Sequence, residues 1–167
     1  FNIAAVWGLP VIFVIENNRY AMGTSAPRST AKPEHLGARG EAFGIPSEQV
    51  DGMDVRAVKD AGDRAVEHCR AGQGPYILEM MTYRYRGHSM SDPAKYRAKE
   101  EVQKMREEHD PIEQVKARIL KANIASEDDL KKIDADIRVI VTEAADFATS
   151  NPEPDASELY TDIYKSA

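Results

Sequence analysis

The chain has 167 residues, of which 42% are hydrophobic and 30% charged, a composition typical of one globular domain with its own core. Its formal net charge of −6 argues against nucleic acid as the main partner. The sequence contains no run of about 18 apolar residues that could form a membrane-spanning helix, and its one cysteine, Cys69, has no partner for an internal disulfide.

The first seven residues, 1–7, have the apolar spacing of the end of an amphipathic helix, with neither a start methionine nor a signal peptide. Gly8-Leu9-Pro10 ends this helix, because proline lacks a backbone donor. We therefore expect the chain to be a piece of a longer one, whose upstream segment carries part of the same chemistry.

The run from Val11 to Ile15 is continuously apolar, which predicts a strand that is covered on both faces, as in a parallel sheet. A long loop with Gly23, Pro27 and Pro33 follows. Residues 34–43 predict a short helix, and residues 49–51 a short strand.

Asp54 is placed to cap a helix that runs to about residue 71, with Gly72 just beyond it. The apolar stripe of this helix has helical spacing and comprises Val55, Val58, Ala61, Ala65 and Cys69. A second buried-type strand covers residues 76–83. This order of elements predicts an α/β fold with a mostly parallel sheet, present here as a partial domain.

After Tyr83 the chain changes character. Residues 84–98 form a polar, basic loop, and the rest is expected to be helical, with helix starts at Asp110-Pro111 and Ser126 and a break at residues 151–154. A last short helix is expected over about residues 156–164. We expect two parts: residues 1–98 as an α/β domain that includes the loop, and residues 99–167 as a helical extension packing on it.

Two asparagines, Asn17 and Asn18, directly follow the first strand. Ligands of open α/β sheets bind beyond the carboxyl ends of the strands, and an asparagine oxygen suits a hard cation such as Mg²⁺. An Asn-Asn pair by itself also fits a simple turn. The basic loop after the second long strand likewise fits either a diphosphate-binding edge or a solvated surface loop.

Two longer strings decide between these interpretations. Residues 1–18 are similar to the second half of the thiamine diphosphate motif, which opens with Gly-Asp-Gly and closes with Asn-Asn after an apolar strand. The string Tyr83 to Pro93, Tyr-Arg-Tyr-Arg-Gly-His-Ser-Met-Ser-Asp-Pro, closely resembles the phosphorylation loop of the alpha subunits of pyruvate dehydrogenases. Residues 16–25, 50–54, 74–75, 110–112 and the helical tail resemble the same family, so the resemblance covers nearly the whole chain.

The resemblance implies a thiamine diphosphate-binding fold with thiamine diphosphate and Mg²⁺ as cofactors. It implies that Asn18 binds the metal through its side chain and that Tyr20 does so through its backbone carbonyl. The aspartate ligand would lie upstream of Phe1. His88 would contact the cofactor diphosphate and handle a proton when the acetyl group passes to lipoamide, a role that suits imidazole near neutral pH.

Ser89 matches the main inhibitory phosphorylation position of the mitochondrial relatives, and Ser25 matches a further one. A phosphate adds about −1.5 to −2 charges, which would repel the cofactor and block the lipoyl domain. Lys95 stands at the remaining site and Arg86 replaces a histidine of animal relatives. These departures argue against control by a kinase and favour a bacterial or otherwise unregulated enzyme. The expected compartment is the bacterial cytoplasm, with the mitochondrial matrix as the alternative.

By resemblance, the complete enzyme decarboxylates pyruvate oxidatively and acetylates lipoyl groups. Its partners would be the missing N-terminal half of the alpha subunit, a beta subunit in an alpha-two beta-two heterotetramer, and the lipoyl domain of the acyltransferase component. This piece alone would be inactive. Three alternatives remain open: a branched-chain 2-oxoacid dehydrogenase, an acetoin dehydrogenase, and a non-catalytic assembly fragment.

Overall fold

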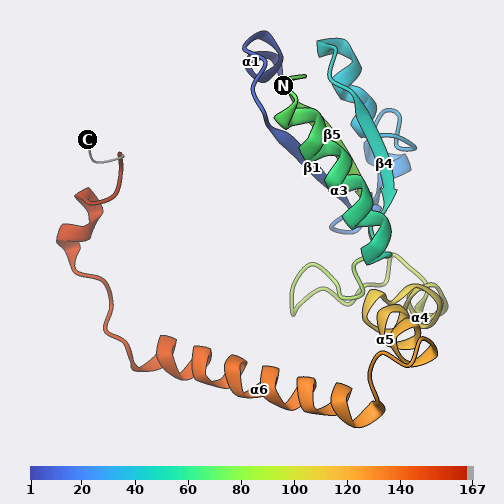
Figure 1. The fold of residues 1–167 in the computed structure, drawn as a ribbon, viewed down its shortest axis with the longest axis vertical. Helices are drawn as coiled ribbons and strands as arrows, with labels where there is room; N and C mark the ends of the chain where they lie inside the picture. The colour runs from blue at the N-terminus through green and yellow to red at the C-terminus, as the bar shows by residue number, and fades with distance from the viewer. Residues whose placement is uncertain (165–167) are drawn as a thin grey trace. The chain divides into compact units, whose positions relative to one another are not determined.

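A computed structural model describes residues 1–164, and the last three residues of the expected extension lie outside the described range. Tertiary contacts divide the chain into a compact first unit, residues 1–118, and a second unit that begins at Ile119. Figure 1 shows the secondary structure of each unit. The expected division after residue 98, and the packing of the extension on the α/β part, stay predictions.

The first unit is built on a sheet of three parallel strands, which confirms the expected α/β fold class (Figure 1). Strand β5 (Tyr76–Met81) lies between β1 (Ile12–Asn17) and β4 (Ser47–Asp51). Asn17 and Asp51, the last residues of the outer strands, both pair with Met81. The carboxyl ends of all three strands therefore meet at one edge of the sheet.

Helix α3 (Val55–Arg70) packs on one face of this sheet. The Asp54 side chain caps it by accepting a hydrogen bond from the Arg56 N–H, as the sequence predicts. Ala61 and Ala65 have no exposed surface, while Val55 at the start of the expected stripe is half-exposed. Small side chains at the centre of the stripe let the helix approach the strands closely.

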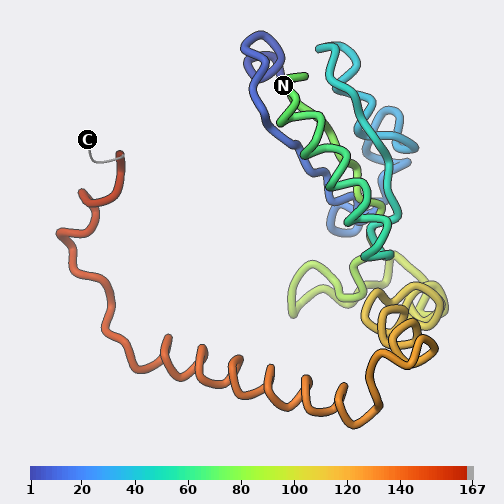
Figure 2. Tube along the Cα trace, in the orientation of Figure 1, coloured from blue at the N-terminus to red at the C-terminus, as the bar shows by residue number. Residues whose placement is uncertain are grey.

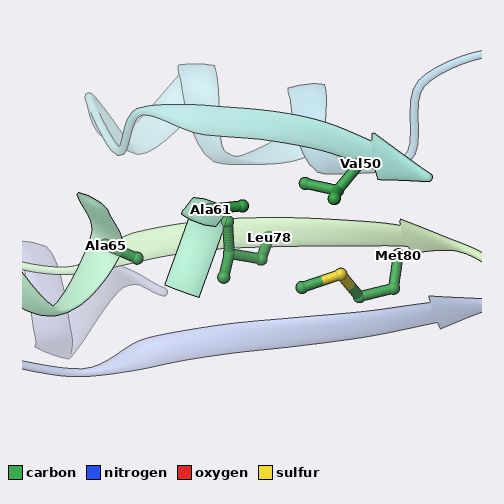
Figure 3. Close-up of a cluster of buried hydrophobic side chains, with 5 residues drawn as sticks. All are labelled: Val50, Ala61, Ala65, Leu78 and Met80. Atoms are coloured by element: carbon green, nitrogen blue, oxygen red, sulfur yellow. The ribbon is translucent and has the colours of Figure 1, made fainter. Parts of the chain in front are cut away.

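The side chains of β5 alternate between the two faces of the sheet, because successive side chains of a strand point in opposite directions. Leu78 and Met80 point toward α3 and pack with three residues of the neighbouring elements: Val50, Ala61 and Ala65 (Figure 3). Ile77 and Glu79 belong to the opposite face. The η1 segment (Gly37–Phe43, a 3-10 helix) covers that face, and the left-handed Gly44 (φ 69°) ends it.

Strand β1 differs from its expected burial. It lies at the edge of the described sheet, and Val14 is 57% exposed. Helix α1 (Asn2–Val6), which precedes it, also leaves Val6 and Trp7 exposed. The apolar run thus predicted the strand correctly, but only part of its surface is covered by residues 1–118.

The segment expected as a long loop contains three short elements. Strands β2 (Tyr20–Ala21) and β3 (Thr24–Ser25) form an antiparallel hairpin, followed by one helical turn, α2 (Ala26–Ser29). Met22 has a φ of 53° in the tight connection. This hairpin immediately follows the asparagine pair and fixes the path of the chain beyond it.

The helices after residue 98 follow the sequence signals. Helix α4 (Lys99–His109) belongs to the first unit, and α5 (Pro111–Lys121) begins there and ends in the second unit. Asp110 accepts hydrogen bonds from the first N–H groups of α5. In the second unit a capping box of Ser126 and Asp129 begins α6 (Glu127–Ser150). The last element, η2 (Ala156–Tyr160), is a 3-10 helix and is shorter than the helix expected over about residues 156–164. Across residues 1–164, none of the helices combines the length and apolarity needed to cross a membrane.

We predict that Gly40→Ala destabilises the protein by about 1–3 kcal/mol, because a Cβ there would lie 2.3 Å from Cδ1 of the fully buried Ile77. The matched control is Gly62→Ala on α3, where a Cβ meets nothing within 4 Å. That change should stabilise the helix by about 0.5–1 kcal/mol. Urea unfolding of the purified proteins measures both, and equal effects of the two changes would contradict the packing described.

Candidate functional site

A tight turn of residues 17–20, here called the asparagine turn, leaves the carboxyl end of β1. The Oδ1 atom of Asn17 accepts a hydrogen bond of 3.0 Å from the Arg19 N–H. Arg19 has a φ of 64°, in the left-handed region that non-glycine residues seldom occupy. A short side-chain hydrogen bond of this kind is what makes such a backbone tolerable in an asparagine turn.

Thr82, directly after β5, ties the asparagine turn to the neighbouring strand. Its N–H donates to the Asn17 carbonyl at 3.0 Å, and its hydroxyl donates to Oδ1 of Asn18 at 3.1 Å. Asn18 therefore has a fixed side-chain oxygen at the edge where the strands end. That oxygen has a second lone pair still available to a ligand.

Glu79 lies beneath the asparagine turn, on the centre strand, with no exposed surface. Its Oε1 accepts a hydrogen bond of 2.7 Å from Nδ2 of Asn17, and its Oε2 accepts one of 3.0 Å from the Gly37 N–H. Burial opposes ionisation, but the hydrogen bonds from Gly37, Asn17 and Leu36 outweigh it and lower the pKa of Glu79. The site thus contains a buried carboxylate that these donors stabilise.

Tyr20 begins the β2–β3 hairpin and pairs with Ser25 across it. The hairpin is closed by a hydrogen bond of 2.8 Å from the Ala26 N–H to the Arg19 carbonyl. The Tyr20 hydroxyl donates to Glu101 of α4 at 3.4 Å. Asn18 and Tyr20 therefore belong to one ordered turn, as their assignment to one cation requires.

The oxygens that this turn offers are neutral and hard, which suits Mg²⁺. Among residues 1–164, no group of three or more His, Cys, Asp or Glu side chains could hold a metal ion. A cation bound by Asn18 and the Tyr20 carbonyl would need further oxygens from a bound diphosphate or from outside these residues. The donor set fits a Mg²⁺-diphosphate and does not make a closed metal cage.

Residues 84–98, here called the histidine loop, run between β5 and α4 (Figure 2). Asp92 organises its centre, accepting hydrogen bonds from the N–H groups of His88 and Ala94 and from the Tyr96 hydroxyl. The hydrogen bond from the His88 N–H is the main cause that lowers the pKa of Asp92. His88 and Ser89 are both exposed, and the Ser89 hydroxyl lies 2.9 Å from that of Ser91.

Arg97 anchors the histidine loop to the asparagine turn. Its guanidinium donates to the carbonyls of Arg84 and Tyr85 and lies over the rings of Tyr20, Tyr83 and Tyr96, with 5.2–5.8 Å from Cζ to the ring centres. The Tyr96 ring lies 5.7 Å from that of Tyr20. Arg97 therefore has a structural role, because its contacts hold the histidine loop in place.

The structure brings Asn18, Tyr20 and the base of the histidine loop to one edge of the sheet. No hydrogen bond of the described residues joins the His88 imidazole to Asn18 or Tyr20. Ser25 lies across the hairpin from Tyr20, and Ser89 lies beside His88 at the exposed tip of the loop. The structural supports Glu79, Thr82 and Glu101 were not found from the sequence, and a glutamate inside an apolar strand was the one available signal.

A comparison with protein families matches residues 1–157 to the model described as "Dehydrogenase E1 component". The chain belongs to the dehydrogenase E1 component family. This confirms the resemblance on which the site was first identified.

Members of the dehydrogenase E1 component family that are similar to this chain include three proteins named pyruvate dehydrogenase E1 component subunit alpha. The chain is 69% identical to the one from Rhizobium meliloti over 98% of its length and 47% of that protein. It is 57% identical to the one from Zymomonas mobilis, with 98% and 46% covered. It is 48% identical to the mitochondrial somatic form of Homo sapiens, with 99% and 42% covered. The chain thus spans about half the length of the curated relatives it matches.

We predict a pH effect at Tyr83, whose hydroxyl donates to Glu101 at 2.7 Å. Burial, and then this hydrogen bond, raise the pKa of Tyr83 to about 12. The folded state favours the neutral phenol, so its contribution to stability is complete below about pH 10 and is lost as pH rises toward about 12.

The measurement is the ultraviolet absorbance of tyrosinate in a pH titration, taken as the difference between the unmodified protein and Tyr83→Phe. The ionisation of Tyr83, which Tyr83→Phe lacks, should have its midpoint near 12. The variant Glu101→Gln should lower that midpoint, because the group that accepts the hydrogen bond loses its charge. A midpoint near the ordinary value of about 10 in the unmodified protein would contradict this account.

Proposed function

We propose that this chain is part of the alpha subunit of a pyruvate dehydrogenase that uses thiamine diphosphate and Mg²⁺, acting in the decarboxylating component of the pyruvate dehydrogenase complex. The single observation that carries the proposal is the anchoring of the histidine loop to the asparagine turn at the carboxyl edge of a parallel sheet. Similar proteins with that name, in bacteria and in mitochondria, support it.

In this proposal Asn18 and Tyr20 hold the metal ion, through a side-chain oxygen and a backbone carbonyl respectively. Bound thiamine diphosphate supplies the electron sink that decarboxylation of a 2-oxoacid requires. Asn18 is suited to this role because Thr82 orients its amide while leaving the oxygen a free lone pair. The contribution of the protein is to fix the diphosphate and its cation at the sheet edge.

His88 is proposed as the catalytic residue of this chain and as a contact of the cofactor diphosphate. Its imidazole is proposed to transfer a proton as a general acid and base while the acetyl group passes to a lipoyl group. The backbone of His88 is held at both its N–H and its carbonyl, by Asp92 and Arg84. The exposed side chain can therefore meet an incoming lipoyl arm without reorganisation of the loop base.

The complete enzyme is proposed to need three partners: the N-terminal half of the alpha subunit, a beta subunit in an alpha-two beta-two heterotetramer, and the lipoyl domain of the acyltransferase component. The fraction of the relatives that this chain covers supports the first of these. The half-exposed Val14 and the exposed Trp7 offer apolar surface for such contacts. We propose the bacterial cytoplasm as the compartment and the mitochondrial matrix as the alternative.

Ser89 and Ser25 are proposed as possible phosphorylation positions. A phosphate on Ser89 would place negative charge beside Ser91 and close to the hydrogen bonds that Asp92 accepts. A phosphate on Ser25 would lie across the hairpin from Tyr20, a proposed cation ligand. Both would act by repelling the diphosphate or by loosening the histidine loop.

We predict that Asn18→Ala in the complete enzyme weakens Mg²⁺ binding in the presence of thiamine diphosphate by at least about tenfold, because one oxygen ligand is removed. Isothermal titration of Mg²⁺ into the cofactor-saturated enzyme measures the effect. The control is Asn151→Ala, at the end of α6, which should bind like the unmodified enzyme. Unchanged affinity in Asn18→Ala would refute the metal assignment.

We predict that His88→Gln slows acetylation of a lipoyl domain by about 10²–10⁴-fold, the usual contribution of a general acid–base residue. Stopped-flow or quenched-flow transfer assays with pyruvate give this rate, and cofactor titration shows whether binding is retained. His109→Gln, at the partly exposed C-terminal end of α4 and outside the histidine loop, is the matched control. Normal transfer in His88→Gln would remove His88 from the proposed mechanism.

A further inference from the structure

The buried carboxylate of Glu79 has no place in the proposed chemistry. It is a completely buried acid in the centre strand of the sheet. Its hydrogen-bond donors are the Asn17 amide and backbone N–H groups, and the His35 ring lies 3.9 Å away. Burying a charge is costly unless hydrogen bonds compensate it. A hydrophobic residue at this position of an apolar strand would avoid that cost.

A carboxylate can accept hydrogen bonds at both of its oxygens, whereas an amide of the same size can accept at only one position. One oxygen of Glu79 faces Nδ2 of Asn17 and the other faces the Gly37 N–H. The Asn17 amide must therefore present its NH₂ group inward and its oxygen outward. That oxygen is the acceptor for the Arg19 N–H.

The orientation of Asn17 has a direct consequence for the asparagine turn. Arg19 has its unusual positive φ in the turn that the Asn17 oxygen closes. Asn18 and Tyr20 lie on either side of Arg19. If the Asn17 amide were reversed, its NH₂ group would face the Arg19 N–H, and the turn would lose the hydrogen bond that closes it. The hydrogen bonds from Thr82 hold Asn17 and Asn18 and do not replace it.

We propose that Glu79 is a positioning residue for the cation site: its carboxylate fixes the Asn17 amide, which holds Arg19 in the conformation that places Asn18 and Tyr20. This inference rests on the proposed function, because it concerns the residues assigned there to Mg²⁺. Glu79 touches neither ligand and acts through Asn17 alone.

The test exchanges acid and amide along this chain of hydrogen bonds. In Glu79→Gln the introduced amide has one acceptor for two donors, so either the Gly37 contact or the Asn17 orientation is lost. Mg²⁺ affinity should fall by about 10-fold or more, as is usual when a residue supporting a metal ligand is changed. In the paired variant Glu79→Gln/Asn17→Asp, the introduced glutamine can accept from Gly37 and donate to the introduced aspartate, whose other oxygen can accept from Arg19.

The experiment uses the full-length alpha subunit assembled with its beta subunit and titrates Mg²⁺ calorimetrically at saturating thiamine diphosphate. The Mg²⁺ affinity of the paired variant should recover to within about threefold of that of the unmodified enzyme. Such a recovery would show strong coupling between positions 79 and 17. Ile77→Val is the matched control, since it removes one buried methylene from the same face of β5 without touching Asn17. Its Mg²⁺ affinity should be unchanged even though its stability falls.

Each outcome decides the inference. It is overturned by normal Mg²⁺ affinity in Glu79→Gln, by a folded paired variant that does not recover, or by an equal loss in Ile77→Val. If Glu79→Gln does not fold, the paired variant decides alone: folded with near-normal affinity supports the inference, and folded with weak affinity overturns it. If the unmodified enzyme itself bound no Mg²⁺ with thiamine diphosphate, the proposed function would fail and this inference with it.

Discussion

The parallel register of β1 with β5 is the constraint on which the rest of the site depends. It aligns Asn17 with Met81, so that two segments more than sixty residues apart in sequence leave the sheet side by side. The asparagine turn and the histidine loop then begin at the same edge, where open α/β sheets bind their ligands. Thr82, one residue beyond the register, joins them.

Much of this fold follows from local sequence signals. Asp54 and Gly72 mark the two ends of α3, and Ser126 marks the start of α6, because helix ends depend on a few residues near each terminus. The apolar runs predicted β1 and β5 for a similar reason. The strand order β1-β5-β4 has no local signal, since it depends on contacts between distant elements.

The sequence pointed to the candidate site residues, whose roles stay predictions, but it did not reveal the residues that support them in the structure. Asn18 and His88 belong to strings that resemble a family, so they could be identified from the sequence. Glu79 and Glu101 could not, because each finds its partners through tertiary contacts: Glu79 with Asn17, 62 residues away, and Glu101 with Tyr20, 81 residues away. The β2–β3 hairpin also escaped, because strands of two residues are too short to show alternation.

The separation of β1 from β5 also has a consequence for biosynthesis. At a translation rate of about 5–20 residues per second, the apolar strand β1 is finished on the order of several seconds before its partner in this sheet emerges from the ribosome. During that interval its backbone groups have no β5 to pair with, and such strand edges are prone to association. The arrangement that forms the site thus leaves β1 without its partner strand in the nascent chain until β5 has been synthesised.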